Sequence, residues 1–178
     1  VAAVLLGAIA AGLAYRRHSR VQMVVAAPAL LAGLVAVGVP VEYQRRARAV
    51  PPIHDISTNL ENPPTFEAIL PLRTDAPNDL ERTPEVTELQ RHGYPDLAPV
   101  TLPIPLDQAF DRALAAAQEA GWQIVTADKS SGRIEATDTT RWFGFKDDVV
   151  VRLTPWGAGT RVDMRSVSRI GRSDIGTN

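Results

Sequence analysis

Residues 141–152 read Arg-Trp-Phe-Gly-Phe-Lys-Asp-Asp-Val-Val-Val-Arg. Three aromatic side chains surround Gly144, and three consecutive valines follow them. Glycine is the residue that tight turns favour, whereas β-branched residues favour a strand. This stretch therefore predicts a turn that leads into the central strand of a small sheet.

Apolar and polar residues alternate on either side of this strand, as they do in a sheet with one buried face. Residues 133–139 and 161–165 each show this pattern, and turn-forming residues precede both. The side chains expected to face the core are Ile134, Ala136, Val149, Val151, Leu153, Val162 and Met164. These segments predict antiparallel strands that are joined by short turns.

An amphipathic helix is predicted between residues 105 and 121. Pro105 suits the first helical position, and Gly121 suits the end of the helix. The apolar stripe consists of Leu106, Phe110, Ala113, Leu114 and Ala117. Such a stripe needs a surface to cover, so residues 98–178 are predicted to form a two-layer α+β domain. One main helix would pack on a mostly antiparallel sheet of roughly three to five strands.

A proline-rich connector, residues 47–97, precedes this domain. Eleven of the chain's 14 prolines lie between Pro51 and Pro105. Proline removes a backbone donor and favours extended geometry in the residue before it. Apolar residues recur through the connector, so we expect it to wrap along the domain, with a short helix near residues 81–91.

Two apolar blocks in residues 1–46 predict two transmembrane helices. The block Val1–Tyr15 is shorter than the roughly 20 residues that a span needs, so its start is expected to lie outside this sequence. The block Val21–Tyr43 is long enough, and spanning helices tolerate its two prolines. A buried helical hairpin in a soluble core is the alternative. The lipid bilayer is therefore the predicted partner of residues 1–43.

Charge is distributed unevenly along the chain. Residues 1–50 carry six arginines and one acid, Glu42, whereas acids are in excess over the remainder. An acidic domain argues against nucleic acid as a partner, because phosphates need clustered Lys and Arg. The short basic loop at residues 16–20 is predicted to be cytoplasmic, although the arginines at 45, 46 and 48 oppose this orientation. The C-terminal domain is thereby predicted to lie on the outer side.

The first candidate site is the Arg- and Ser-rich segment 165–174. Its candidate ligand-binding residues are Arg165, Arg169, Arg172, Ser173 and Asp174. Guanidinium groups beside hydroxyl groups ahead of a helix start can hold a phosphate or a carboxylate. The alternative is an internal network in which Asp148 or Asp174 neutralises the arginines.

The second candidate site is the aromatic cluster Trp142, Phe143 and Phe145. These side chains could enter a lipid surface or line an apolar pocket, because aromatic rings supply large apolar contact areas. Packing in the core competes with both functions and is the favoured interpretation.

The remaining polar residues do not assemble into a catalytic motif. Asp147 and Asp148 point to opposite faces of a strand, which argues against a shared-proton pair. One of them is expected to pair with an arginine and the other to be solvated. His54 and Asp55 are expected to satisfy backbone groups of a loop. The sequence contains no phosphate-loop, dinucleotide, nucleophile-elbow or zinc motif, so neither a metal nor a cofactor is predicted.

Three separated motifs resemble a known family. They are Pro-Pro-Ile-His-Asp-Ile-Ser-Thr-Asn at 51–59 with Glu-Asn-Pro-Pro at 61–64, Thr-Arg-Trp-Phe-Gly-Phe-Lys-Asp-Asp at 140–148, and the segment 165–176 with Gly-Arg-Ser-Asp inside it. Over residues 50–178 the chain is similar to bacterial proteins of the domain-of-unknown-function family 1499 (DUF1499). The resemblance implies an envelope protein with apolar segments ahead of the domain. It implies no activity and no catalytic residues, and it implies a C-terminal helix that this sequence cuts short.

These observations predict a non-catalytic protein of the bacterial inner membrane, with a periplasmic domain that binds a partner protein or an envelope component. The alternative is a domain that binds a small anion or a lipid headgroup through segment 165–174. A hydrolase is the third hypothesis, and it would need His54, Asp147 and Asp148 to converge. A pocket that joins the arginines to the aromatic residues would favour ligand binding, whereas a flat apolar patch would favour a protein partner.

Overall fold

The computed structural model describes residues 7, 9, 12, 16, 20–141 and 143–173. It separates into two units, Val1–Ala49 and Val50–Asn178. The first unit contains helix α2 (Arg20–Ala49), which includes the predicted span Val21–Tyr43 with both of its prolines. Among the described residues, no helix combines the length and the apolar character that crossing a bilayer requires. The first predicted span lies almost entirely outside the described residues.

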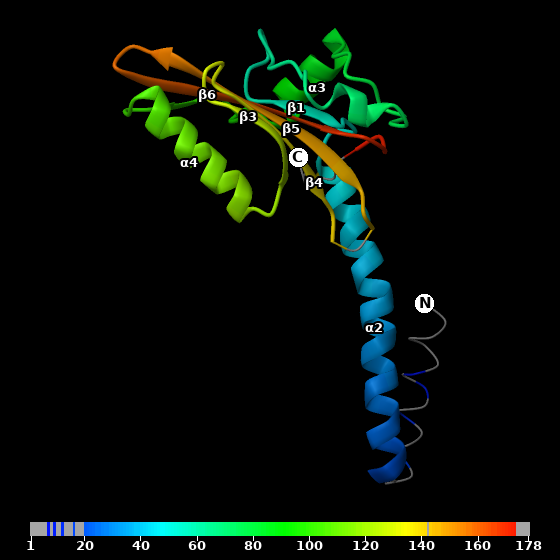
Figure 1. Ribbon diagram of the computed structural model, residues 1–178. Helices are drawn as coiled ribbons and strands as arrows, with labels where there is room; N and C mark the ends of the chain where they lie inside the picture. The colour runs from blue at the N-terminus through cyan, green and yellow to red at the C-terminus, as the bar shows by residue number, and fades with distance from the viewer. Residues whose placement is uncertain are drawn as a thin grey trace. The chain divides into compact units, whose positions relative to one another are not determined.

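The second unit is built on one sheet of six strands, all paired antiparallel (Figure 1). The strands are β1 (Asp55–Ser57), β2 (Val100–Leu102), β3 (Gln123–Asp128), β4 (Arg133–Thr139), β5 (Lys146–Trp156) and β6 (Gly159–Ser168). Their order is β1-β6-β5-β4-β3, and β2 pairs with an earlier part of β6 than β1 does. The α+β class and the antiparallel sheet are confirmed, but the sheet has more strands than the sequence predicts.

Helix α4 (Leu106–Glu119) packs on one face of the sheet, against β3, β5 and β6 (Figure 1). Phe110 is 2 % exposed and forms the centre of this core. The core residues are Ala109, Phe110, Ile134, Val149, Val151 and Leu153. Gly121, at φ +81°, follows the helix in a left-handed conformation that glycine adopts readily. The predicted helix and its apolar stripe are confirmed.

The connector covers the opposite face of the sheet. Phe66 and Ile69 from the connector pack on Val150 of β5 and Val167 of β6, and all four are buried. The short 3₁₀ helix η1 (Leu70–Arg73) follows these residues directly. The connector therefore supplies a second hydrophobic core in addition to the one beneath α4.

Covering both faces changes which strand residues are buried. Val150 is fully buried, although it alternates with the valines that face α4. On β6, Val162 packs against the core beneath α4 as predicted, but Met164 is 39 % exposed. Its neighbours Asp163 and Arg165 are buried instead. The prediction for Met164 is wrong because the covered side of β6 at this position is the side beneath the connector.

Helix α3 (Pro84–Gly93) lies beside β1, on the connector side of the sheet (Figure 1). It begins after Thr83, whose side-chain oxygen accepts the Val86 N–H, and proline occupies the first turn. Gln90 is buried and exchanges two hydrogen bonds with the backbone of Ser57, at 2.6 and 3.0 Å. An amide side chain thereby satisfies the free edge of β1.

Candidate functional site

The face of the sheet beneath the connector carries charged side chains that are almost completely buried. We call it the polar face. Its most deeply buried charged residues are Asp55, Glu135, Asp148, Asp163 and Arg165, each between 0 % and 5 % exposed. Burying a charge is costly unless an opposite charge and hydrogen bonds replace its water. The partners of these groups therefore determine what the polar face can do.

Asp55 of β1 is held by two arginines. Arg165 of β6 donates from Nε to Oδ1 at 3.0 Å and from Nη2 to Oδ2 at 2.8 Å, a bidentate arrangement. Arg82 of the connector lies 2.9 Å from Oδ1. Burial lowers the pKa of Arg82, whereas the charge and hydrogen bond of Asp55 oppose that shift. Both arginines therefore act as counter-ions inside the protein.

Asp148 of β5 has the same pattern of partners. Arg169, which follows β6, donates to both carboxylate oxygens at 2.9 Å, and Arg73 of η1 donates to Oδ2. Thr137 of β4 completes the site with a 2.8 Å hydrogen bond to Oδ1. One carboxylate thus neutralises one of two guanidinium groups, so this group of residues keeps a net positive charge.

The other two acids of the polar face are also engaged. Asp163 pairs with Arg152 of β5 at 3.0 Å. Glu135 accepts the backbone N–H groups of Glu67 and Ile69, at 2.8 and 2.9 Å. These bonds hold the connector against the sheet where its apolar side chains enter the core. The charges of the polar face therefore join the connector to the sheet.

These contacts give two of the predicted ligand-binding arginines carboxylate partners within the protein. Arg169 binds Asp148, as the internal network of the sequence analysis anticipates, but Arg165 binds Asp55. Asp147 is only 7 % exposed, so the prediction that one of the paired acids is solvated is wrong. Asp147 also takes part in an interaction of its own, so neither acid of the pair is a solvated charge.

The other predicted residues of segment 165–174 have different surroundings. Arg172 is exposed, whereas Ser173 is half-buried and has a polar contact of its own. Asp174, like Trp142 of the aromatic cluster, lies outside the described residues. The three arginines of the segment therefore have three different environments, and Arg172 alone among them is exposed.

The aromatic turn, residues 140–145, joins β4 to β5. Gly144 has φ +65°, and its N–H donates to the Thr140 carbonyl at 3.0 Å. Phe143 is 76 % exposed and Phe145 is 48 % exposed, and their rings stack with centroids 5.7 Å apart. The prediction that these rings pack in the core is wrong, because both stand in the loop between the paired strands.

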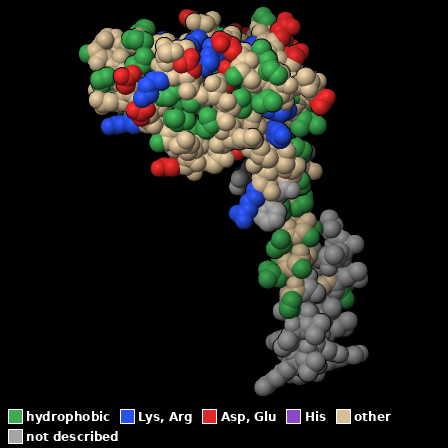
Figure 2. Space-filling view, viewed as in Figure 1, with side chains coloured by type: hydrophobic (Ala, Val, Ile, Leu, Met, Phe, Trp, Pro, Cys, Tyr) green, Lys and Arg blue, Asp and Glu red, His purple; other side chains and the backbone are tan. Residues whose placement is uncertain are grey.

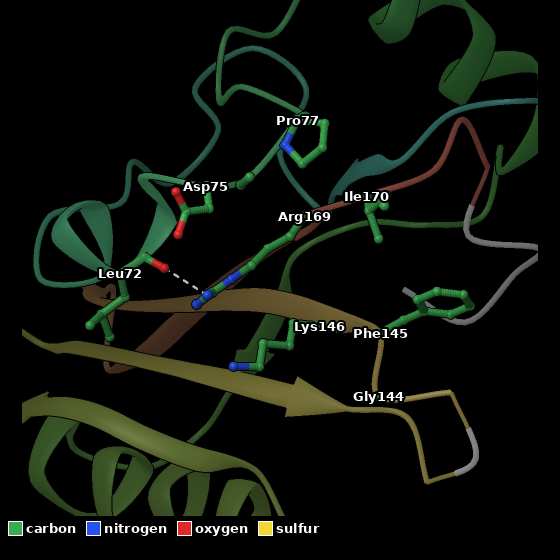
Figure 3. A pocket seen from close by; sticks show the side chains of 9 residues that line it. Leu72, Asp75, Pro77, Gly144, Phe145, Lys146, Arg169 and Ile170 are labelled. Carbon is green, nitrogen blue, oxygen red and sulfur yellow. Dashed lines mark hydrogen bonds between the residues drawn. The ribbon is translucent and has the colours of Figure 1, made fainter.

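An open pocket of about 450 Å³ lies beside the aromatic turn (Figure 3). It is lined by Leu72, Asp75, Ala76, Pro77, Gly144, Phe145, Lys146, Arg169 and Ile170. Leu72, Phe145 and Ile170 are each about half exposed, so its apolar walls meet solvent. A volume of this order is typical of small-ligand sites. The pocket joins Arg169 to Phe145, the combination that the sequence analysis links to ligand binding.

Two charged side chains of the pocket are not among the site residues predicted from the sequence. Asp75 of the connector and Lys146 of β5 lie on opposite sides of the Arg169 side chain (Figure 3). Both are exposed, and neither side chain forms an ion pair or hydrogen bond within the described residues. Arg169 differs, because Asp148 and the Leu72 carbonyl, at 2.6 Å, hold its guanidinium. Only the fold brings Asp75 and Lys146 to one place.

The rest of the visible surface of the second unit carries acids and bases side by side (Figure 2). Such mixing creates no extended field of one sign that would attract a polyanion. Within residues 20–141 and 143–173, together with the four earlier described positions, no group of three His, Asp or Glu side chains is placed to hold a metal ion.

The fold and the site define an α+β domain whose antiparallel sheet is covered by a helix on one face and by a proline-rich connector on the other. The family model described as "Protein of unknown function (DUF1499)" matches residues 55–178, and the chain belongs to this family. Neither the curated proteins nor the solved structures contain a match to the chain. The family match covers all six strands, the pocket and the aromatic turn.

Proposed function

We propose that the chain is a non-catalytic envelope protein, anchored in the bacterial inner membrane by its N-terminal segment. Its α+β domain would lie in the periplasm and bind a partner protein or an envelope component. The apolar block Val21–Tyr43 and the basic loop at residues 16–20 support the anchor and the orientation. Membership of the family defines the domain at residues 55–178 but assigns no activity to it.

The observation that carries the binding role is the exposed apolar surface around the pocket. Phe143 is 76 % exposed, and Leu72, Phe145 and Ile170 stand about half in solvent. Large exposed apolar patches mark interaction surfaces in soluble domains. The acids of the polar face are engaged by arginines and backbone donors, so they favour a structural role over acid–base chemistry.

A second candidate function is the binding of a small anion or a lipid headgroup. The observation that favours it is the net positive charge of the Arg73, Asp148 and Arg169 group at the wall of an open pocket. An anion near this group would gain electrostatic stabilisation without displacing the internal ion pairs. Arg172, the exposed arginine of segment 165–174, would add charge nearby in the sequence.

Cysteine accessibility tests the anchor and the orientation directly, because the chain has no cysteine of its own. Phe143→Cys places a thiol on the exposed turn, and Ser19→Cys places one in the loop predicted to be cytoplasmic. Spheroplasts of expressing cells are treated with a membrane-impermeant maleimide, before and after lysis. We expect Phe143→Cys to label before lysis, Ser19→Cys to label only after it, and both proteins to stay in membranes washed with carbonate.

Two results would contradict the proposal. Labelling of Phe143→Cys only after lysis would place the domain in the cytoplasm. Release of the chain by the carbonate wash would remove the membrane anchor. Phe143 is 76 % exposed, so poor labelling of Phe143→Cys even after lysis would contradict the exposure of the aromatic turn.

A further inference from the structure

The open pocket presents an unpaired acid and an unpaired base to the same volume. Asp75 and Lys146 both line it, both are exposed, and neither side chain has a hydrogen-bond or ion-pair partner within the described residues. The two are also not paired with each other, so their charged atoms lie more than 4.0 Å apart. A ligand with one positive and one negative group would therefore complement both side chains at once.

The surroundings distinguish the two ends of such a ligand. Arg169 forms one wall between Asp75 and Lys146 (Figure 3), and its ion-paired group keeps a net positive charge. An anion is therefore favoured next to Lys146, where both cations contribute. The other end would face Asp75. An ionised carboxylate accepts hydrogen bonds and has no hydrogen to donate.

The cationic end is best supplied by a primary ammonium. An ammonium donates hydrogen bonds to a carboxylate, whereas a quaternary ammonium has no donor and relies on several aromatic faces. Of the aromatic rings among the described residues, only Phe145 lines the pocket. The acid at position 75 therefore suits a primary amine better than a choline group.

The apolar walls indicate what else the ligand carries. Leu72, Phe145 and Ile170 are 51 %, 48 % and 52 % exposed, and each could bury further area against an apolar chain. Burial of such surface contributes roughly 25 cal/mol per Å². Charges alone at an open site contribute little, because solvent screens them. The walls therefore supply the affinity and the charges supply the selectivity.

We propose that this pocket binds an amphiphile whose polar end joins an anionic group to a primary ammonium, the chemistry of an ethanolamine phospholipid headgroup. Lys146 and the Arg169 group hold the anion, Asp75 holds the ammonium, and the apolar walls hold the start of the chain. The inference rests on the proposed function, because it names the class of envelope component that the domain binds.

The test measures binding to the full chain in maltoside micelles, from the dependence of Tm on ligand concentration. The probes are dihexanoyl phosphatidylethanolamine, the glycerol and choline phospholipids of the same chain length, and soluble phosphoethanolamine. We expect the ethanolamine lipid to bind about fivefold more tightly than the other two lipids, the effect of one partly exposed ion pair. Tighter binding of the lipid than of phosphoethanolamine would support the amphiphile, and equal binding would contradict it, because the apolar walls would then contribute no affinity.

Two variants separate the roles of the charges. Asp75→Asn should remove the preference for the ethanolamine lipid, so that it binds no more tightly than the glycerol lipid. Lys146→Gln should weaken binding of both lipids about fivefold. Asp96→Asn and Lys129→Gln neutralise exposed charges outside the pocket and should change neither affinity.

Equal affinities of the wild-type chain for the three lipids would overturn the inference. So would variants at Asp75 and Lys146 that bind like the wild type, or control variants that lose as much affinity as they do. These results leave the proposed function untouched, because the anchor and orientation are read from cysteine labelling. Labelling of Phe143→Cys from the wrong side would remove the proposed function whatever the lipid affinities are.

Discussion

Arg165 and Asp55 lie 110 residues apart in the sequence and form a bidentate ion pair inside the domain, with N–O distances of 3.0 and 2.8 Å. The pair joins the last strand to the first and brings the connector onto the sheet. Arg82 shares the same carboxylate. Loss of the acid would leave two buried guanidinium groups without a counter-ion, which makes Asp55 the sensitive member of the group.

Asp55→Asn should therefore lower the free energy of unfolding by about 3–5 kcal/mol, the usual cost of breaking a buried ion pair. Urea unfolding of the full chain in micelles, followed by tryptophan fluorescence, measures this change. Glu88→Gln is the matched control, because Glu88 pairs with Arg91 on the exposed surface of α3. Its cost should stay within about 1 kcal/mol. Equal losses in the free energy of unfolding of the two variants would show that the buried Asp55 pair stabilises the fold no more than an exposed pair does.

Two phenylalanines of very different burial give a second prediction. Phe110 is 2 % exposed beneath α4, whereas Phe143 is 76 % exposed on the aromatic turn. Phe110→Ala should cost about 3–5 kcal/mol, because it removes buried area and leaves a cavity. Phe143→Ala should change stability by less than about 0.5 kcal/mol, as most surface substitutions do. A large loss in Phe143→Ala would mean that the turn packs against the domain.

Helix α4 and strand β6 show what sequence patterns can and cannot predict. Helix α4 and its stripe follow from a 3.6-residue period that one covered face imposes. The burial of Arg165 and the exposure of Met164 do not follow from alternation, because the connector covers the second face. Sequence alternation identifies two faces of a strand but does not reveal that a distant segment covers the polar one.

The sequence predicts part of the candidate site and misses the rest. The aromatic residues and Arg169 stand out in the sequence, and the fold brings Phe145 and Arg169 to one pocket. Asp75 and Lys146 carry no local signal, because an isolated acid in a connector and a lysine at a strand start resemble ordinary solvated charges. Their common position depends on the connector crossing the sheet, which is a tertiary property.

Two glycines with positive φ provide a test of backbone packing. A Cβ at Gly132 would lie 2.3 Å from the Leu153 carbonyl oxygen, whereas a Cβ at Gly121 would meet nothing within 4 Å. Alanine costs roughly 1–2 kcal/mol at either position, because both need a left-handed conformation. Gly132→Ala should therefore lose distinctly more stability than Gly121→Ala in urea unfolding. Similar losses would mean that the β3–β4 turn can move away from β5.

The β3–β4 turn also predicts a pH dependence. Hydrogen bonds from the side chains of Ser130 and Ser131, and from the Ser130 N–H, lower the pKa of Asp128 to about 2 from its ordinary 3.8. The depressed pKa stabilises the folded turn fully above pH 3.8, and this contribution is lost as the pH falls through about 2. Carboxyl NMR titration of the full chain should show the low pKa directly.

The serines are the internal control for that titration. Replacing Ser130 and Ser131 together by alanine should raise the pKa of Asp128 toward 3.8, because both side-chain donors are removed. An unchanged Asp128 curve would mean that the turn does not hold the serines against the carboxylate.

Under the proposed function, the charged pairs hold the domain together and the aromatic turn around Phe143 contacts the binding partner. Phe143 and Trp156 allow a direct comparison, because Phe143 precedes β5, Trp156 is its last residue, and they are 76 % and 57 % exposed. A photoreactive benzoylphenylalanine replaces each in turn, and intact expressing cells are irradiated. We expect an adduct with a defined envelope component, identified by mass spectrometry, from position 143 and not from position 156. Identical adducts from both positions, or none from position 143, would contradict the proposed binding role of the aromatic turn.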